Sequence, residues 1–243
     1  MNRTLVTGGT RGIGAATALR LARDGHDLVL GYTRDDRAAE ETRLAVEDAG
    51  AHCVLVRTDL TEPEGVDRLF ECAGDLTGVV NNAGATLHLG PLAETPPDVV
   101  AATVDLNLTA ALLVARAAVR ALGTSYGGSG GVLVNVSSGA ATLGSPGEYV
   151  QYAAAKAGVD ALTVGLAQEV AGEGIRVVGV APGIVRTTIH ADAGEPGRVE
   201  RVGPLVPLGR AGEPHEVADA ISWLMSDEAS YVTGTTLRVA GGR

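Results

Sequence analysis

Tyr152 and Lys156, four residues apart, are the two side chains of this sequence best suited to acid–base chemistry. Lys156 is the only lysine among 243 residues, and every other Lys/Arg position is an arginine. A guanidinium is larger and planar and keeps its proton, so a site that needs a compact ammonium cannot use it. Lys156 is therefore either a functional ammonium or a chance survivor on an exposed surface. On a helix, the offset of four places both side chains on one face, about one turn apart.

An ammonium held beside a tyrosine changes the acidity of the phenol. A free tyrosine has a pKa of about 10, which is too high for ready proton exchange at neutral pH. A fixed neighbouring cation stabilises the phenolate and lowers the phenol pKa. The pair therefore predicts general acid–base catalysis on a substrate oxygen.

A glycine-rich stretch near the N-terminus, "TLVTGGTRGIG", predicts a turn from a first strand into a first helix. Gly8, Gly12 and Gly14 allow the backbone to bend sharply and to approach a pyrophosphate at the helix N-terminus. Their spacing departs from the GxGxxG pattern of dinucleotide-binding turns, and a purely structural tight turn is the alternative.

The end of the second predicted strand bears on the choice of dinucleotide. Dinucleotide-binding enzymes often place an acidic residue there to hold the ribose hydroxyls. This chain has Tyr32 at that position, with Arg11 in the glycine turn and Arg34 just beyond the strand. Two arginines without an acid favour NADP(H) over NAD(H). The alternative is that both arginines are solvated surface residues, with Asp35 and Asp36 nearby.

Short apolar runs alternate with helical patterns along the chain, which predicts an α/β fold. Strands are expected at 3–7, 27–32, 52–57, 77–81, 131–137, 175–180 and 236–239. Helices are expected near 11–24, 36–49, 62–73, 97–122, 149–172 and 213–226. Apolar strands that alternate with helices indicate a doubly wound, Rossmann-type fold, with a mostly parallel seven-stranded sheet covered on both faces.

The domain organisation is expected to be simple. No repeat and no linker interrupts the chain, so residues 1–243 are predicted to form a single dinucleotide-binding domain. A Gly/Pro-rich stretch at about 184–210 follows a strand end and is too long for a plain connection. This stretch is predicted to be a substrate lid.

Composition argues against several classes of protein. The net charge of −10 disfavours nucleic acid and anionic membranes as partners. Cys53 and Cys72 are the only cysteines and match neither a disulfide framework nor a metal site. The strand pattern begins by residue 3, which leaves no room for a signal peptide, and no apolar run is expected to cross a bilayer. A soluble, cytoplasmic protein without a metal is predicted.

Five motifs occur in an order and spacing that resemble the short-chain dehydrogenases/reductases: TGGTRGIG, NNAG at 81–84, NVSS at 135–138, YAAAK at 152–156 and APGIVRT at 181–187. The match extends through the C-terminal stretch and is similar to the single-domain branch that contains 3-oxoacyl-carrier-protein reductases and glucose-dehydrogenase-like enzymes. The resemblance implies an oxidoreductase that reduces a ketone, or oxidises the corresponding secondary alcohol, with a nicotinamide cofactor.

The resemblance also implies roles for individual residues. Tyr152 would be the general acid in reduction and the base in oxidation, while Lys156 would hold the nicotinamide ribose and lower the phenol pKa. Ser138 would bind the substrate oxygen, with adjacent Ser137 as the alternative. Asn107 would anchor a water that relays protons to the lysine. Tyr149, at the wrong offset from the lysine, is expected to pack near the site or help to line it.

The cofactor contacts implied by the resemblance extend over several loops. Asp59 would meet the adenine, with a role near a helix N-terminus as a compatible alternative; Asn81 would lie near the adenosine ribose and Thr187 near the nicotinamide carboxamide. The full predicted set is Gly8, Thr10, Arg11, Gly12, Ile13, Gly14, Tyr32, Arg34, Asp59, Leu60, Asn81, Ala83, Gly84, Tyr152, Lys156, Pro182, Gly183, Val185 and Thr187.

Association and substrate are less constrained. The helices at 97–122 and 149–172 are apolar or small on more than one face, and the resemblance implies a homo-oligomer, commonly a tetramer, that pairs through them; an ordinary buried helix is the alternative. His190 in the lid either touches substrate or faces solvent. Two other hypotheses remain beside the enzyme, namely a non-catalytic dinucleotide-binding sensor and a scaffold, and the carbonyl substrate stays open.

Overall fold

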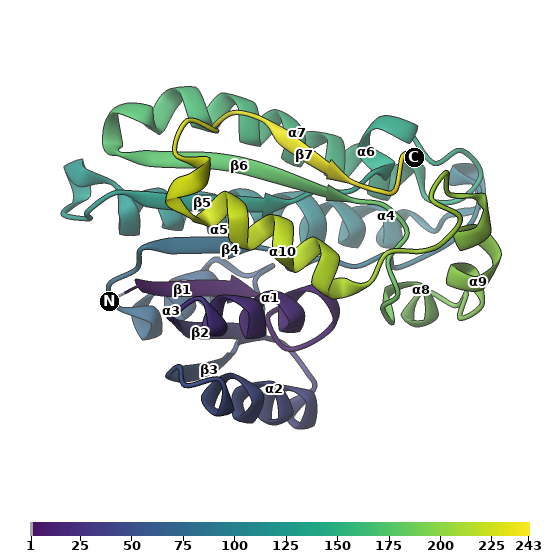
Figure 1. Cartoon of the computed structure of the whole chain (residues 1–243). Coiled ribbons are helices and arrows are strands. Elements are labelled where there is room, and N and C mark those ends of the chain that lie inside the picture. The colour runs from purple at the N-terminus through teal and green to yellow at the C-terminus, as the bar shows by residue number, and fades with distance from the viewer. Residues whose placement is uncertain (1) are drawn as a thin grey trace.

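Residues 2–243 are described by the structure, a computed structural model, and within this range seven parallel strands form one sheet (Figure 1). The strand order is β3-β2-β1-β4-β5-β6-β7. The strands are β1 (Asn2–Thr7), β2 (His26–Tyr32), β3 (Cys53–Arg57), β4 (Gly78–Asn81), β5 (Gly131–Val136), β6 (Ile175–Pro182) and β7 (Thr236–Val239). The predicted doubly wound α/β fold with a seven-stranded sheet is confirmed.

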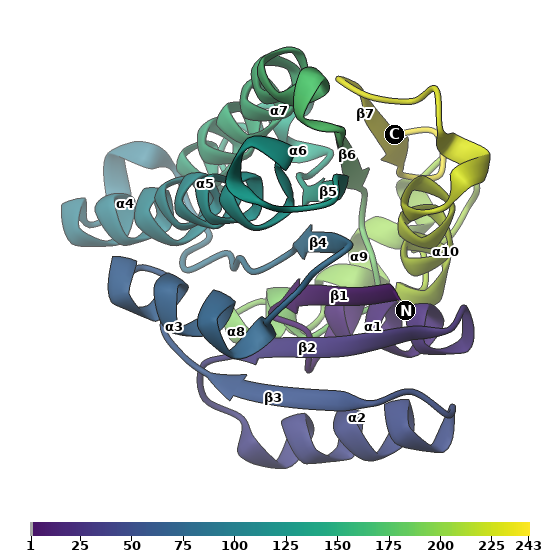
Figure 2. The same cartoon turned by 90° about the vertical axis from the view of Figure 1, so that its left-hand side faces the viewer.

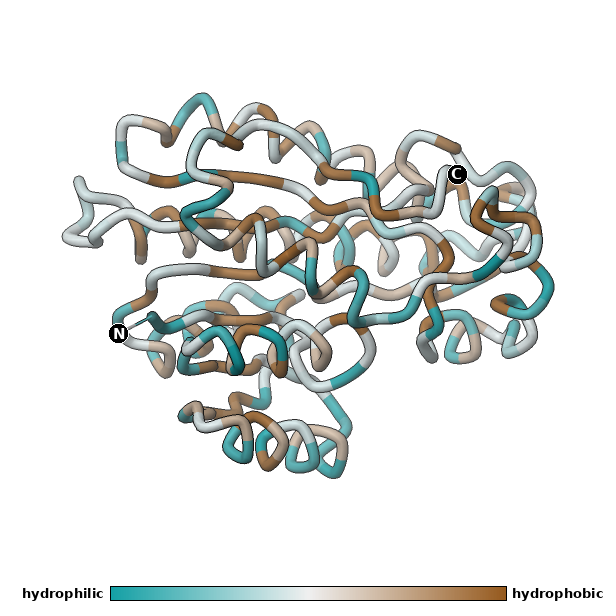
Figure 3. The backbone as a smooth tube through the Cα atoms, in the orientation of Figure 1, coloured by the Kyte–Doolittle hydropathy of each residue, from teal (hydrophilic) through white to brown (hydrophobic). Residues whose placement is uncertain are grey.

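Helices cover both faces of this sheet (Figure 2). One face carries α1 (Gly12–Arg23), α2 (Asp36–Asp48) and α10 (Pro214–Met225). The other carries α3 (Pro63–Ala73), α5 (Ala110–Leu122) and α7 (Val150–Val170). Because side chains alternate along a strand, Leu5 packs with the second group and Val6 with the first. The strands therefore follow continuous apolar runs, which stand out along the middle of the molecule (Figure 3).

Polar side chains set where several helices begin. Asp35 precedes α2 and accepts a hydrogen bond from the backbone N–H of Ala38 at 3.0 Å. Glu213 and Glu216 form a capping box at the start of α10, where Pro214 occupies the first turn. These residues satisfy backbone donors that a helix cannot pair internally.

The segment predicted as one helix over 97–122 is interrupted in the structure. It consists of α4 (Pro97–Val104), a π-helical turn η2 (Asp105–Thr109) and α5. Asn107, inside η2, donates its side-chain amide to the Thr103 carbonyl at 2.9 Å and to the Ala85 carbonyl at 2.9 Å. A side chain that takes up a backbone carbonyl widens the helix locally, and such turns are frequent at functional sites.

The combined helix over 97–122 has the predicted bounds but is more apolar than expected. Its 26 residues reach a mean hydropathy of 1.6, enough by length and composition to cross a membrane, with 33% of the most apolar window buried. This corrects the expectation that no apolar run approaches that length. In the described fold, the Ala110, Val114 and Ala118 face of α5 is buried against the sheet as part of the core.

The stretch 184–210 crosses the carboxyl ends of the strands (Figure 1). It contains α8 (Ile189–Asp192), α9 (Arg198–Val202) and a 3-10 turn η5 (Gly203–Leu205), none of which the sequence pattern predicted. The remaining short helices are α6 (Ala140–Leu143), η1 (Leu92–Glu94), η3 (Thr124–Tyr126), η4 (Ala171–Glu173) and η6 (Asp227–Ala229). The order in which the strands are added to the sheet reverses between β1 and β4, and in such sheets ligands bind outside the carboxyl ends of the strands at this point.

Candidate active site

Tyr152 and Lys156 lie in the first two turns of α7 and are both buried, with 7% and 4% of their surface exposed. The Lys156 Nζ is 5.8 Å from the centroid of the Tyr152 ring. The same Nζ donates a hydrogen bond to the Val136 carbonyl, at the end of β5, at 2.9 Å. The helix therefore presents both groups toward the carboxyl edge of the sheet, as the offset of four predicts.

Burial dominates the acidity of both groups. It raises the pKa of Tyr152 to about 12, while hydrogen bonding with Ser138 acts in the opposite direction. Burial lowers the pKa of Lys156 to about 8, with the Asp160 carboxylate acting in the opposite direction. The phenol pKa therefore lies above its ordinary value, contrary to the expected lowering, and Tyr152 is a protonated phenol at neutral pH.

The two adjacent serines after β5 point in different directions. Ser137 is buried, and its hydroxyl donates to the Lys156 carbonyl at 3.2 Å. Ser138 is partly exposed, accepts a hydrogen bond from the Ala140 N–H at 3.1 Å, and influences the Tyr152 phenol. Of the two serine hydroxyls, that of Ser138 is thus the one hydrogen-bonded with the Tyr152 phenol.

A glycine separates Asn107 from the lysine. Asn107 is fully buried, and its side-chain oxygen accepts from the Ala85 N–H at 3.1 Å. A Cβ atom built on Gly84 would lie 2.7 Å from that oxygen and 3.2 Å from the Lys156 Nζ. The backbone after β4 therefore passes between the two side chains, and only glycine fits there without displacing one of them.

The glycine turn between β1 and α1 is held by residues that the sequence patterns did not single out. Gly8 and Gly12 have positive φ angles of 60° and 51°, which favour glycine. The Asn82 side chain donates to the carbonyls of Thr7 and Gly8 at 2.9 and 3.2 Å. A Cβ on Gly14 would overlap the Gly8 carbonyl. Asn82 follows Asn81 in the NNAG motif, which was the available signal for its role.

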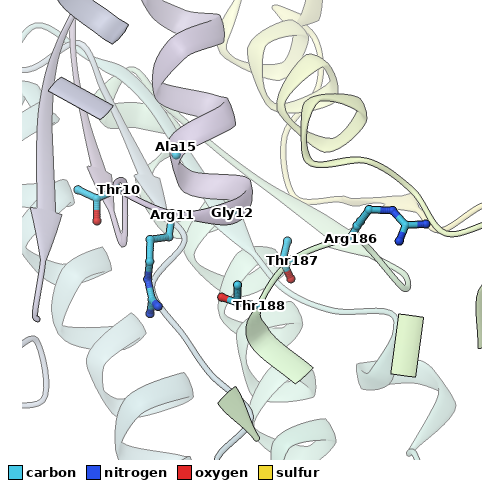
Figure 4. Close-up of a pocket in the computed structure, with 7 residues that line it drawn as sticks. All are labelled: Thr10, Arg11, Gly12, Ala15, Arg186, Thr187 and Thr188. Carbon is cyan, nitrogen blue, oxygen red and sulfur yellow. The ribbon is translucent and has the colours of Figure 1, made fainter. Parts of the chain in front are cut away.

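A cavity of about 560 Å³ opens at this turn and at the strand end that leads into 184–210 (Figure 4). It is lined by Thr10, Arg11, Gly12, Ala15, Arg186, Thr187 and Thr188. The methyl group of Thr187 lies 3.2 Å from where a Cβ on Gly12 would stand. The first turn of α1, described in full, has no acidic side chain. Glycines, hydroxyls and an uncompensated helix N-terminus fit a dinucleotide pyrophosphate.

Arg11 and Arg34 are exposed, and Arg11 pairs with Asp192 of α8 at 3.6 Å. The Tyr32 hydroxyl donates to Asp36 at 2.9 Å. Arg57, which was not predicted, pairs with the same carboxylate at 3.0 Å. Arg34 and Arg57 thus lie at the ends of β2 and β3, where Asp36 is paired with Arg57, while Arg11 lies at the glycine turn.

Several other predicted cofactor residues have structural contacts of their own. Asp59 is exposed and accepts from the N–H and the hydroxyl of Thr61 at 3.0 and 2.8 Å, in the turn before α3. The Asn81 amide points into the core, where it donates to the Ala111 carbonyl at 2.9 Å and to Asn135 at 3.1 Å. Its side-chain amide is therefore taken up by partners within the fold, and its position near the ribose stays a prediction.

The remaining members of the predicted set surround the same edge of the sheet. Thr10 lines the cavity, whereas Leu60 and Val185 are buried. Ala83 donates its N–H to the Thr7 hydroxyl at 2.9 Å. The others flank the glycine turn or the end of β6: Ile13, Pro182 and Gly183.

Two further ring side chains, Tyr149 and His190, are buried. Tyr149 lies beside Tyr152, and His190 lies in α8 of the stretch 184–210. The Tyr149 ring meets the Tyr152 ring edge to face, with centroids 5.5 Å apart and an interplanar angle of 89°. His190 has 8% of its surface exposed, so it does not face solvent. Burial and the nearby Arg198 guanidinium lower the pKa of His190 to about 4. The imidazole is therefore neutral at neutral pH.

Comparison with known proteins identifies the family. A family model described as enoyl-(acyl carrier protein) reductase matches residues 8–243. The chain is 44% identical over 243 residues to "Uncharacterized oxidoreductase YgfF" of Escherichia coli, with 98% of each chain covered. It is 39% identical to 3beta-hydroxysteroid dehydrogenase 1 of Eggerthella lenta, covering 98% of this chain and 92% of that one.

A solved short-chain dehydrogenase from Burkholderia cenocepacia in complex with NADP superposes with a TM-score of 0.89 at 32% identity, covering 99% of this chain and 97% of that one. Fold, family model and relatives agree. The chain belongs to the short-chain dehydrogenase/reductase family. It is accordingly an NAD(P)-dependent oxidoreductase.

Proposed function

We propose that this protein is an NADPH-dependent carbonyl reductase that converts a ketone to a secondary alcohol, with Tyr152 as the general acid. The buried pair of Tyr152 and Lys156 carries the proposal, because a phenol hydrogen-bonded with Ser138 has the lysine Nζ 5.8 Å from its ring, where the cation can stabilise the phenolate left after proton transfer. The same residues would oxidise the alcohol when Tyr152 is ionised.

Each residue of the site has a separate part in this reaction. Ser138 donates a hydrogen bond to the substrate carbonyl and orients it toward the phenol. Tyr152 transfers its proton to the carbonyl oxygen as the alcohol forms. Lys156, fixed by the Val136 carbonyl, lies behind the Tyr152 ring and stabilises negative charge on the phenolate that remains. Asn107 and Gly84 keep the lysine in place from the other side.

The cavity beside the glycine turn would hold the cofactor. Its pyrophosphate would lie against the N-terminus of α1, and Thr187 is within reach of the same turn. When bound, NADPH would supply the hydride to the carbonyl carbon. Asp59 and Leu60 would border the adenine end, and Lys156 would hold the nicotinamide ribose.

Reductase activity is tested by a screen of carbonyl compounds, which follows NADPH absorbance at saturating cofactor. Ketones of several classes belong in the screen, including thioester-linked, steroid-like and cyclic compounds. Consumption that depends on both enzyme and ketone supports the proposal. Tight NADPH binding without turnover of any compound would instead support a cofactor sensor.

NADPH is expected to bind more tightly than NADH by about tenfold or more, because a contact with a charged group is worth about 1.5–3 kcal/mol. Arg11 and Arg34 are exposed beside the cavity and the end of β2, and a relative was solved with NADP. Fluorescence titration of both cofactors measures the ratio. Arg11→Gln should weaken NADPH binding and leave NADH binding nearly unchanged. Tighter binding of NADH would contradict the preference.

We also propose that residues 1–243 act as one dinucleotide-binding domain whose segment 184–210 is a substrate lid. The segment crosses the carboxyl edge of the sheet and contributes Arg186, Thr187 and Thr188 to the cavity. A small-molecule carbonyl compound or alcohol in the cytoplasm is the expected partner. The net charge of −10 disfavours nucleic acid and anionic membranes.

A homotetramer is the proposed assembly. Leu112 on α5 and Val164 on α7 are each 45% exposed, so the helices proposed to pair leave apolar side chains on their outer faces. Light scattering at micromolar concentration should give a mass four times that of the 24.5 kDa chain. Leu112→Glu should shift that mass downward, whereas a stable wild-type monomer would contradict the assembly.

A further inference from the structure

A buried arginine joins the proposed lid to the start of the catalytic helix. Arg198 is the first residue of α9, and 3% of its side chain is exposed. One guanidinium nitrogen donates to Glu148, just before α7, at 2.6 Å, and another donates to Glu195 of the lid at 2.9 Å. A buried charge that loses its partners is strongly unfavourable. The cluster therefore holds the lid against the residues that precede α7.

The same guanidinium also fixes an aromatic ring. The nitrogen that bonds Glu148 donates to the Tyr149 hydroxyl at 3.0 Å. The guanidinium carbon (Cζ) of Arg198 lies 5.1 Å from the centroid of the Tyr149 ring. A cation over the ring and a donor at its hydroxyl together restrict the ring to one orientation.

Tyr149 passes this restriction to the proposed proton donor. Its ring meets Tyr152 edge to face at a centroid distance of 5.5 Å, and both rings belong to a small apolar cluster with Ala140 and Ala153. Nearby backbone contacts, such as the Gly90 N–H to Glu148 carbonyl bond of 2.6 Å, hold the loop. These backbone contacts leave the direction of the Tyr149 ring to Arg198.

We infer that Arg198 is a positioning residue for Tyr152 that acts through Tyr149, so that the proton donor is aligned only when the lid is closed. The inference rests on the proposed function of Tyr152 as general acid. No group of Arg198 exchanges a proton or touches the reacting atoms. Its contribution is to couple lid closure to the orientation of the phenol.

Arg198→Met is expected to lower the single-turnover rate constant for reduction by about tenfold or more, because small misplacements of catalytic groups have effects of this size. The dissociation constant for NADPH should stay within about twofold, since the cavity for the cofactor lies at the glycine turn. Tyr149→Phe keeps the ring and removes the hydroxyl contact. It should lower the same rate constant by a smaller factor.

Arg201→Met is the matched control. Arg201 is on the same short helix and also pairs with Glu195, but it is 54% exposed and its described contacts do not include Tyr149. Its rate constant should remain close to that of the wild type. In the double variant Arg198→Met/Tyr149→Phe, the loss should be close to that of Arg198→Met alone, because both changes remove one shared contact.

A second readout follows the lid without turnover. A glutamate-specific protease that cuts after Glu200, within α9, should cleave Arg198→Met faster than Arg201→Met. Wild-type rate constants in both Arg198→Met and Tyr149→Phe would overturn the inference. Losses that simply add in the double variant would overturn it as well. Should Arg198→Met fail to fold, Tyr149→Phe alone decides, because a wild-type rate constant there overturns it as well.

Tyr152→Phe, measured in parallel, separates this inference from the proposed function. If Tyr152→Phe loses reduction while Arg198→Met and Tyr149→Phe keep it, only the coupling through Arg198 is wrong. If Tyr152→Phe reduces ketones at the wild-type rate, the proposed function itself is wrong.

Discussion

Tyr152→Phe is expected to slow ketone reduction by about 10²- to 10⁴-fold, the usual loss when a positioned acid–base group is removed. The variant keeps the ring that packs against Tyr149 and removes the phenol proton that the proposed reaction transfers to the carbonyl oxygen. NADPH affinity should change little, because Tyr152 lies outside the cavity at the glycine turn. The measurements are single-turnover rate constants and cofactor titrations, with the exposed Tyr231→Phe as control.

The wild-type pH profile should differ between the two directions of reaction. Burial raises the pKa of Tyr152 to about 12, so the phenol stays protonated from pH 6 to pH 9 and its titration should not change the rate of reduction in that range. Reduction should fall only above pH 8, where Lys156, with a pKa of about 8, loses its charge. Oxidation needs the phenolate, whose fraction rises about tenfold per pH unit below the pKa. Alcohol oxidation should therefore accelerate toward high pH. A rate of oxidation that falls as the pH rises would contradict Tyr152 as the base.

Lys156→Arg is expected to lose most turnover although it preserves a positive charge. The Lys156 Nζ lies in a buried space between the Val136 carbonyl and Gly84, and 4% of the residue is exposed. A planar guanidinium is too large for this position, and it cannot release a proton as a lysine with a pKa of about 8 can. A loss of about 10²-fold is expected, with weaker NADPH binding.

The reverse exchange at an exposed position is the control for Lys156→Arg. Arg23, near the end of α1, is exposed, and Arg23→Lys should leave both turnover and NADPH affinity unchanged. Thermal unfolding shows whether each variant remains folded. If folded Lys156→Arg reduced ketones at the wild-type rate, the lysine would be a chance survivor and its place in the site would have no catalytic meaning.

The fold could be predicted from sequence because its dominant signal is local. Strands such as Ile175–Pro182 are apolar on both faces, and the intervening helices have the length and starting residues that the patterns require. The offset of Tyr152 and Lys156 was also readable, since helix geometry alone fixes it. The π-helical turn at Asn107 could not be predicted from the sequence. It depends on two hydrogen bonds between the Asn107 side chain and the backbone of Ala85, which is distant in sequence.

Parts of the site depend on tertiary contacts that produce no periodic pattern in the sequence. The turned-in amide of Asn81 follows from partners on β5 and α5, which only the assembled sheet brings together. Arg198 and Tyr149 are 49 residues apart, and neither belongs to a recognisable motif. The phenol pKa was expected to fall because a cation was near, whereas in the folded chain burial raises it.

The sequence holds a single side-chain amine, and that amine is buried in the site with a pKa lowered to about 8. Chemical labelling can therefore address the site without mutation. Isotopic methylation of lysine would place one side-chain probe in the whole protein, at the Lys156 Nζ, whose NMR signal would report its titration directly. Bound cofactor should shield the amine from the reagent, so that the extent of labelling becomes a measure of site occupancy even when no substrate is known.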